Sequence, residues 1–260
     1  MNIRFYLTYI RIIENNILAL MHRKKRCFIH LKHVGAAFQI RTGNDRITIS
    51  TLRRWRRYRF GIDRWLERLA GEYGYKQHWT LRPGDTVIDI GANIGEFSIF
   101  SASQGAQVIS IEADNYIFDI LKSNAKEQAI ETINCAIWKE DGAVTFYSSY
   151  EDADSSTIEP ASFTEEYPQR ALTLDTIVEQ RGIEDIALIK CDAEGAEPEV
   201  LAGAKRTLLR TRALTLDCGY ERQGTSTVAE CKAILQTAGF HVTDYKIRGR
   251  IIVFARKDGP

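Results

Sequence analysis

The sequence lacks the long apolar runs and the paired cysteines that would place it in a membrane or in an oxidising compartment. The most apolar N-terminal stretch, residues 5–20, is interrupted by Arg11 and Glu14, which is too much charge for a spanning helix of about 20 residues. No small-residue cleavage site follows a signal-type apolar segment. The five cysteines are irregularly spaced and form no CxxC pair, so reduced thiols fit better than a disulfide framework or a zinc site. We therefore expect a cytoplasmic protein.

Two nucleotide-binding signatures are also missing. The sequence has no GxxxxGK[ST] phosphate loop, and its Gly-rich turn, Gly91-Ala-Asn-Ile-Gly95, lacks the third glycine of the GxGxxG turn of dinucleotide-binding proteins. The turn follows an apolar run and precedes apolar residues at helical spacing, which predicts a strand, a tight turn and a helix. Glycines in such a turn let the backbone approach a ligand closely.

The net charge of +1 conceals a strong asymmetry along the chain. Residues 1–82 hold 18 Lys/Arg and 5 Asp/Glu, so this part is basic and the remainder is acidic. We expect residues 1–80 to form a basic N-terminal extension, and residues 81–260 to form the catalytic domain.

The extension begins with a predicted amphipathic helix over residues 2–20, followed by a basic cluster at residues 22–26. The apolar side chains share one broad face: Ile3, Tyr6, Leu7, Ile10, Ile13, Ile17, Leu18 and Met21. One interpretation is a helix lying on an anionic membrane surface. The other is a helix packed on the domain with a solvated basic end.

A hairpin is predicted over residues 38–50, and a run of five arginines and two aromatic residues follows at residues 53–59. Basic and aromatic residues together suit a nucleic acid, a polyanionic glycan or a lipid headgroup. The alternative is a helix with its arginines in water and Trp55 in the core. Nucleic acid is disfavoured, because no signature of a nucleic-acid-binding module accompanies the run. Residues 61–76 predict another helix.

From residue 85 onward, predicted strands and helices alternate. This pattern indicates an α/β fold with a mostly parallel sheet and helices on both faces. Residues 241–245 and 250–254 predict a final antiparallel pair of strands. Residues 148–168 are polar and acidic and predict a long surface loop, either a lid or an insertion without function.

Carboxylates end several of the predicted strands, where ligands bind in open α/β sheets. Glu112 follows Asp89 by about 20 residues, the spacing of a carboxylate that hydrogen-bonds ribose hydroxyls. Asp89 would repel a pyrophosphate but tolerate a cationic sulfonium. The ligand predicted from these residues is therefore S-adenosylmethionine, an adenosine-type cofactor without phosphates.

Several motifs together resemble the FkbM family of S-adenosylmethionine-dependent methyltransferases. They occur in the family's order between residues 83 and 218 and comprise Asp89-Ile-Gly-Ala-Asn-Ile-Gly95, Ile111-Glu112, Leu172-Thr-Leu-Asp175, Ile189-Lys-Cys-Asp-Ala-Glu-Gly-Ala-Glu197 and Leu201-Ala-Gly-Ala204. Cys191 departs from the aliphatic residue common in the family, and Asp217 stands where Glu is common. The resemblance implies a seven-stranded, Rossmann-like class I methyltransferase fold with an antiparallel last strand, and methylation of a hydroxyl oxygen.

The resemblance also implies roles for individual residues. It assigns the methionine end of the cofactor to Asp89, Gly91, Asn93 and Gly95. It assigns the ribose to Glu112 and places Ala136, with its neighbours Cys135 and Ile137, near the adenine.

A hydroxyl acceptor must lose its proton, for which a nearby carboxylate is suited. Glu194 and Asp192 are the candidate catalytic residues, because they leave a strand beside the expected methyl group. Alternatively, Asp192 orients the cofactor, while Glu194 caps the next helix or pairs with Lys190. A further alternative is a divalent cation on Asp192 and Asp217 that acidifies the hydroxyl, although we expect no resident metal.

The sequence thus predicts an O-methyltransferase for a small-molecule or glycan acceptor, with a sugar hydroxyl favoured. Peripheral contact with the anionic inner face of a membrane, or with a lipid-linked precursor, stays open. The alternatives are an RNA or DNA methyltransferase that uses the arginine run, and a non-catalytic cofactor-binding module. No Asn/Asp-Pro-Pro-Tyr motif is present, which speaks against the commonest adenine-methylating enzymes.

Overall fold

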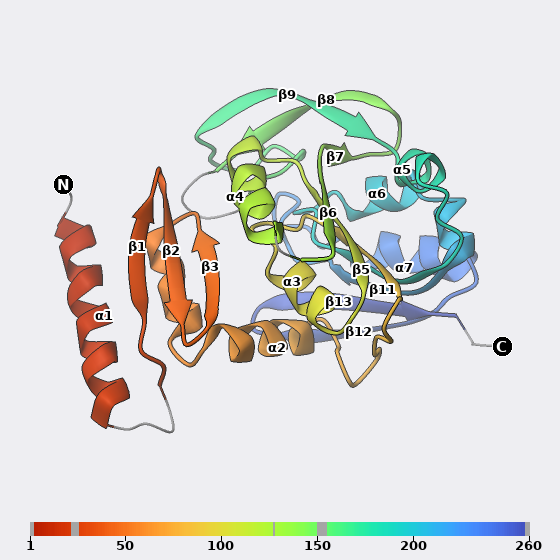
Figure 1. Ribbon diagram of the computed structural model, residues 1–260. Coiled ribbons are helices and arrows are strands. Elements are labelled where there is room, and N and C mark those ends of the chain that lie inside the picture. Colours follow the sequence, from red (N-terminus) through yellow and green to blue (C-terminus); the bar gives the residue numbers. More distant parts are fainter. Residues whose placement is uncertain (1–2, 22–25, 127, 150–154, 258–260) are drawn as a thin grey trace.

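The computed structural model describes residues 3–21, 26–126, 128–149 and 155–257 of the 260-residue chain. Its centre is a seven-stranded sheet with the strand order β12-β13-β11-β10-β4-β5-β6 (Figure 1). Within this sheet β13 is antiparallel to both of its neighbours, β12 and β11, and the five strands from β11 to β6 pair in parallel. The predicted seven-stranded, mostly parallel sheet with an antiparallel last strand is therefore confirmed. The strands are β4 (Thr86–Ile90), β5 (Gln107–Glu112), β6 (Ile130–Asn134), β10 (Ile186–Cys191), β11 (Thr211–Asp217), β12 (His241–Ile247) and β13 (Arg250–Arg256).

The central strands are apolar on both faces, which a parallel sheet between helical layers requires. All six residues of β10 are buried, and so are the last four of β4. One apolar cluster packs side chains of α2 (Ile62–Glu72), α3 (Glu96–Ser103) and α4 (Asn115–Ala125) on one face. The other cluster packs side chains of α5 (Leu174–Gln180), α6 (Glu197–Ala202) and α7 (Val228–Thr237) on the opposite face.

A small second sheet was only partly predicted. It has the order β7-β9-β8 and consists of β7 (Ala136–Ile137), β8 (Gly142–Ser148) and β9 (Glu165–Leu172). Residues 132–137, which the sequence pattern predicts as a single strand, are divided between β6 and β7. The loop predicted over residues 148–168 contains the first half of β9, and residues 150–154 of it lie outside the described part. The strand β9 was not predicted, because its first half is exposed and polar. This half also contains Pro168, and a proline normally argues against a strand.

The N-terminal region packs on the large sheet through a shared core. It consists of α1 (Ile3–Met21), an antiparallel sheet of β1 (His30–Val34), β2 (Ala37–Thr42) and β3 (Asp45–Ile49), the 3₁₀ helix η1 (Leu52–Tyr58), and α2. The predicted hairpin and helices are confirmed, whereas β1 was not predicted. Buried Ile40 and Ile47 belong to the same apolar cluster as Val87 of β4. The division of the chain into residues 1–80 and 81–260 stays a prediction.

The arginine run forms η1, and its two aromatic residues face the protein. Trp55 and Tyr58 are 5% and 0% exposed, so neither ring is available to stack on a base. Arg54 and Arg57 form ion pairs with Glu96, the first residue of α3. The interpretation that places Trp55 in the core is confirmed in that respect, but it also placed the arginines in water, whereas the Arg54 side chain is only 10% exposed and faces Glu96.

Glu96 joins the N-terminal region to the helix that follows the Gly-rich turn. Its carboxylate is buried and accepts hydrogen bonds from Tyr58 Oη at 2.5 Å and Trp65 Nε1 at 2.6 Å. Burial alone would raise the pKa of Glu96, but the Arg54 and Arg57 guanidinium groups outweigh it and lower that pKa. Glu96 therefore stays ionised and holds η1 and α2 against α3.

Glu96→Gln should strongly destabilise the protein, because it removes the negative charge that faces the buried Arg54 guanidinium. Breaking a buried ion pair from one side typically costs about 3 kcal/mol or more, and we expect a loss of this size in the free energy of unfolding in urea. The matched control is Glu140→Gln, at an exposed position, which should change it by less than about 0.5 kcal/mol. Equal stability of the two variants would contradict this role of Glu96.

Candidate active site

The Gly-rich turn connects β4 to α3 and packs tightly against the segment that follows β10. Gly91 has a φ of 65°, and a Cβ atom there would lie 1.9 Å from the backbone oxygen of Asp192. At Gly95, with a φ of 91°, a Cβ would lie 2.7 Å from Leu121 Cδ1. Asn93 between them also has a positive φ of 51°. The two glycines are thus required by close packing as well as by backbone conformation.

A buried lysine fixes the end of β4. Lys190 Nζ, on the neighbouring strand β10, donates to the Gly91 backbone oxygen at 2.8 Å and lies 3.1 Å from Asp89 Oδ1. The other carboxylate oxygen of Asp89 accepts from Ser98 Oγ at 2.6 Å. Burial would lower the pKa of Lys190, but Asp89 and Asp192 outweigh it and raise that pKa. Asp89 is fully buried and supports the turn through Lys190; its predicted contact with the cofactor stays a prediction.

Glu112, at the end of β5, organises the loop next to the turn. Its two carboxylate oxygens accept from the backbone N–H groups of Asn93 and Asp114, both at 2.8 Å. Burial raises the pKa of Glu112 to about 7. Glu112 lines a small cavity together with Gly91, Asn93 and Ala136. The structure therefore brings together four residues that were predicted to bind the cofactor, whereas Asp89 and Gly95 do not line this cavity.

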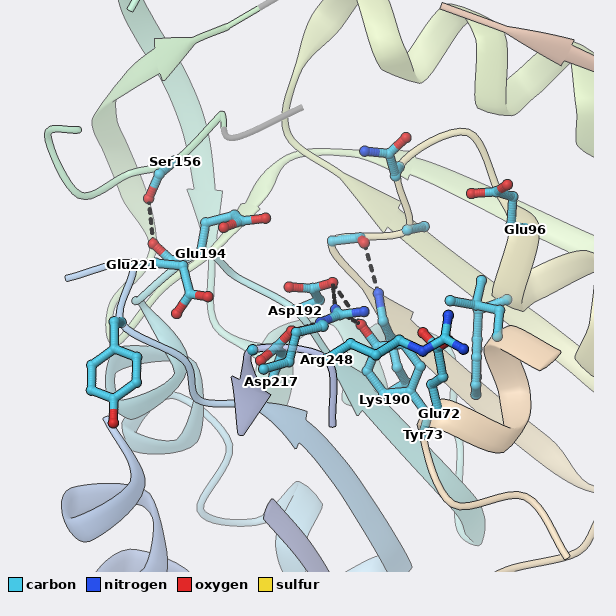
Figure 2. A pocket seen from close by; sticks show the side chains of 18 of the residues that line it. Glu72, Tyr73, Glu96, Ser156, Lys190, Asp192, Glu194, Asp217, Glu221 and Arg248 are labelled. Carbon is cyan, nitrogen blue, oxygen red and sulfur yellow. Dashed lines mark hydrogen bonds and ion pairs between the residues drawn. The ribbon is translucent and has the colours of Figure 1, made fainter. Parts of the chain in front are cut away.

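A larger cavity of about 1340 Å³ adjoins the small one. Gly91, Asn93, Asp192 and Glu194 line both cavities, so the Gly-rich turn and the segment after β10 form their common border. The N-terminal region supplies part of the opposite wall of the larger cavity, including Trp65 and Tyr73 of the α2 segment. Figure 2 shows the polar side chains that converge on this space.

Asp192 belongs to a partly buried network that closes one side of the larger cavity (Figure 2). Its Oδ2 atom accepts from Tyr73 Oη at 2.7 Å and from Arg250 Nη2 at 2.8 Å. Burial would raise the pKa of Asp192, but Arg250 and Lys190 outweigh it and lower that pKa. Asp192 therefore stays ionised and is engaged on one oxygen by two donors.

Arg250 also hydrogen-bonds Asp217, so its guanidinium lies between the two carboxylates. Burial, with a further contribution from Asp192, raises the pKa of Asp217 to about 7. The guanidinium takes the position that a divalent cation shared by these two carboxylates would need. Within the described part of the chain, no group of three or more His, Cys, Asp or Glu side chains has the arrangement of a metal site.

Glu194 lies in a strained loop between β10 and α6. Its φ of 50° is unusual for a residue with a Cβ atom, and such strain is often retained at functional sites. Glu197 holds the loop, because its fully buried carboxylate accepts from the backbone N–H groups of Ala193 and Gly195 and from Thr227 Oγ1. The N-cap of α6 is Ala196, without a side-chain cap, so Glu194 does not cap that helix.

Part of the polar loop after β8 covers the two cavities. Ser156 Oγ donates to the Glu194 backbone oxygen at 2.9 Å, and Ser155 Oγ donates to Asp114 Oδ2 at 2.9 Å. Residues 155–157 line the small cavity, and Ser156 with residues 158–161 lines the larger one. This position fits the lid interpretation of the loop better than an insertion without function.

Sequence analysis did not identify three residues that contribute to the site. Tyr73 fell within the helix predicted over residues 61–76 and was given no role at the site, and Arg250 was predicted only as the first residue of a strand. Arg54 was one of five arginines with no distinguishing feature, yet its Nη1 atom donates to Asn93 Oδ1 at 2.5 Å. One sequence feature could have identified Arg250. It is a charged residue at the first position of an apolar strand, and carboxylates were predicted at the ends of other strands of the sheet.

Glu197→Gln should weaken the pH dependence of stability. Burial raises the pKa of Glu197 from 4.5 to about 7, so the folded protein retains a proton that the unfolded chain releases. The resulting stability is fully present below a pH of about 4.5 and is lost as the pH rises through about 7. A shift of this size corresponds to roughly 3 kcal/mol.

The free energy of unfolding in urea, measured between about pH 5 and pH 8, should therefore fall less steeply in Glu197→Gln than in the unmodified protein. Glu112 and Asp217, whose pKa values are also raised to about 7, should leave a residual slope. The exposed control Glu140→Gln should keep the original slope. Parallel curves for the unmodified protein and Glu197→Gln would refute the proposed titration.

Two curated relatives are similar to part of this chain. The 31-O-demethyl-FK506 methyltransferase FkbM of Streptomyces tacrolimicus is 30% identical over 159 residues, covering 48% of this chain and 61% of the relative. The 2-O-methyltransferase NoeI of Sinorhizobium fredii is 29% identical over 150 residues, covering 50% of this chain and 62% of the relative. The matches thus span about three fifths of the length of these relatives.

A solved structure of a putative rRNA-methylase from Clostridium thermocellum is 12% identical, with a TM-score of 0.47 and coverage of 74% of this chain and 96% of that chain. A likeness at this level says nothing about the substrate. The family match is more specific, because residues 89–242 match the methyltransferase FkbM domain and include the Gly-rich turn, Glu112 and the loop of Glu194. The chain therefore belongs to the FkbM family of S-adenosylmethionine-dependent methyltransferases.

Proposed function

We propose that this protein transfers the methyl group of S-adenosylmethionine to a hydroxyl oxygen of a small-molecule or glycan acceptor, with a sugar favoured. The observation that carries the proposal is the pair of adjoining cavities with Asn93, Asp192 and Glu194 at their border. One cavity suits the adenosine end of the cofactor, and the other leaves room for an acceptor. The names of the two relatives, which refer to O-methyl transfer, support the same reaction.

The residues of the small cavity fit the proposed cofactor. Each Glu112 oxygen accepts one backbone N–H and keeps lone pairs for ribose hydroxyls. Ala136 and Ile137 supply an apolar wall suited to an adenine ring. Gly91 and Asn93 line the cavity and offer backbone groups to the methionine end. When bound, the cofactor supplies an activated methyl group.

The larger cavity has the composition expected for a polyhydroxylated acceptor. Aromatic rings of Trp65, Tyr73 and Tyr220 line it, and such rings combine a flat apolar face with a polar edge. The carboxylates of Glu72 and Glu221 also line it and can accept hydrogen bonds from hydroxyl groups. Arg54 and Arg57 are already engaged by Asn93 and Glu96, which weakens the nucleic-acid alternative.

We assign different roles to the two candidate catalytic carboxylates. Asp192 is held ionised by Arg250 and Lys190, and a carboxylate with a lowered pKa is a poor base. Its role is to position Tyr73 and Arg250 in the cavity wall. Glu194 lies at the border of both cavities, in a loop whose backbone is strained, and is assigned as the base.

In the proposed reaction, the hydroxyl proton passes to Glu194. S-adenosylmethionine, held by Gly91, Asn93 and Glu112, would supply the methyl group to the acceptor oxygen, and its sulfur would keep the electron pair of the S–CH₃ bond. Because the displacement is in line, much of the rate enhancement should come from holding the acceptor at the cavity border.

Calorimetry should show binding of S-adenosylmethionine and no binding of NAD, because the turn lacks the third glycine of dinucleotide sites. Glu112→Ala should raise the dissociation constant at least about tenfold, equivalent to about 1.4 kcal/mol, because two backbone N–H groups and the ribose lose their acceptor. Glu140→Ala, at an exposed position, serves as the control. Tight NAD binding without S-adenosylmethionine binding would overturn the cofactor assignment.

Glu194→Gln should lower kcat by about 10²-fold or more, the range of a lost general base, without changing cofactor affinity. Turnover is measured as S-adenosylhomocysteine release with a panel of monosaccharides, oligosaccharides and short RNAs. The Glu140→Gln protein is the control. Unchanged turnover in Glu194→Gln would remove the base assignment, turnover with RNA alone would favour a nucleic-acid substrate, and cofactor binding without turnover on any acceptor would favour a binding module.

A further inference from the structure

The broad apolar face of α1 points away from the rest of the protein. Six of its apolar side chains are between 51% and 70% exposed, and no charged residue interrupts them on a helical projection. We call them the α1 stripe: Tyr6, Ile10, Ile13, Ile17, Leu20 and Met21. Soluble proteins rarely expose a contiguous apolar patch of this kind unless it meets a partner.

The opposite face of α1 fixes this orientation. Asn15 is fully buried, and its Nδ2 atom donates to the Cys27 backbone oxygen at 3.0 Å. Asn16 accepts from the Ile29 N–H at 2.8 Å and donates to the Ile29 backbone oxygen at 2.9 Å. Ile12, which is buried in the main core, lies on the same side. The helix is therefore anchored by its narrow polar face, and the stripe cannot turn inward without breaking these contacts.

Most charged residues near the stripe are positive, and the exception on α1 is Glu14, which is exposed at the edge of the stripe. Residues 1–49 contain nine Lys/Arg and two Asp/Glu. In the described part, Arg11 on α1, Lys32 on β1 and Arg46 on β3 are exposed. The edge strand β1 lies next to α1 (Figure 1). An apolar helix face bordered by cations is the pattern of helices that lie in the interface of an anionic bilayer.

Two other arrangements, a membrane-spanning helix and pairing with a second copy, fit the α1 stripe less well. No helix in the described residues is long and apolar enough to cross a membrane, so α1 would lie along a bilayer rather than span it. The spacing of the α1 stripe also resembles a coiled-coil seam. However, the 19 residues of α1 make fewer than the three to four heptads that such a seam needs. Pairing two copies would also bring their basic surfaces together, which like-charge repulsion opposes.

We propose that α1 docks the protein flat on an anionic phospholipid surface, with the α1 stripe inserted at the boundary between headgroups and acyl chains. Arg11 and Lys32 contact the headgroups beside it. This docking does not depend on the identity of the methyl acceptor or on catalysis, so its test is independent of the proposed function.

Flotation of the full chain with vesicles tests the proposal. The unmodified protein should bind vesicles of phosphatidylcholine with about 30% phosphatidylserine, and it should bind pure phosphatidylcholine much more weakly. Ile10→Asp/Ile17→Asp should reduce binding to the anionic vesicles at least about tenfold by removing apolar insertion. Arg11→Glu/Lys32→Glu should also reduce it and should abolish the preference for phosphatidylserine.

The matched controls are Leu209→Asp and Lys205→Glu, at exposed positions far along the sequence from α1, which should bind as the unmodified protein does. Thermal unfolding of all variants separates loss of docking from loss of folding. Absence of vesicle binding by the unmodified protein, or equal binding of the stripe variant, would overturn the proposal. A dimer in sedimentation equilibrium that Ile10→Asp/Ile17→Asp dissociates, without vesicle binding, would assign the stripe to a second copy instead.

Discussion

The site depends on the contacts of one buried group, the ammonium group of Lys190. It joins the ends of the two central strands, because it lies on β10 and binds the Gly91 backbone oxygen and the Asp89 carboxylate at the end of β4. A buried cation needs such partners to remain charged. Gly91 can approach β10 this closely only because it has no side chain. The Gly-rich turn, which the sequence indicated as a ligand-binding motif, is therefore also required for packing within the sheet.

The same turn is held from its other side by the N-terminal region. Arg54 reaches Asn93 within the turn, and Glu96, immediately after it, collects hydrogen bonds from Tyr58 and Trp65. The basic extension thus acts as a structural wall of the larger cavity as well as a source of charge. Some of its arginines neutralise a buried carboxylate, and others stay at the surface.

Features that depend on neighbours in sequence were predictable, and features that depend on distant contacts were not. The apolar run before Gly91 and the carboxylate of Glu112 at the next strand end follow from local pattern and from the general rule for open α/β sheets. Arg250 between Asp192 and Asp217 required knowledge of which strand lies beside which. The amphipathic pattern of α1 revealed an apolar face, but not that buried Asn15 would turn this face outward. The strand β9 was hidden because half of it is solvated and polar.

The hydrogen bond between Tyr73 and Arg250 joins residues 177 positions apart in the chain. Contacts of such separation form late, because the entropy of closing a long loop must be overcome first. The wall of the larger cavity therefore depends on two distant parts of the chain, because Tyr73 follows α2 and Arg250 begins β13. Under the proposed function, the acceptor site is complete only when both parts have packed on the central sheet.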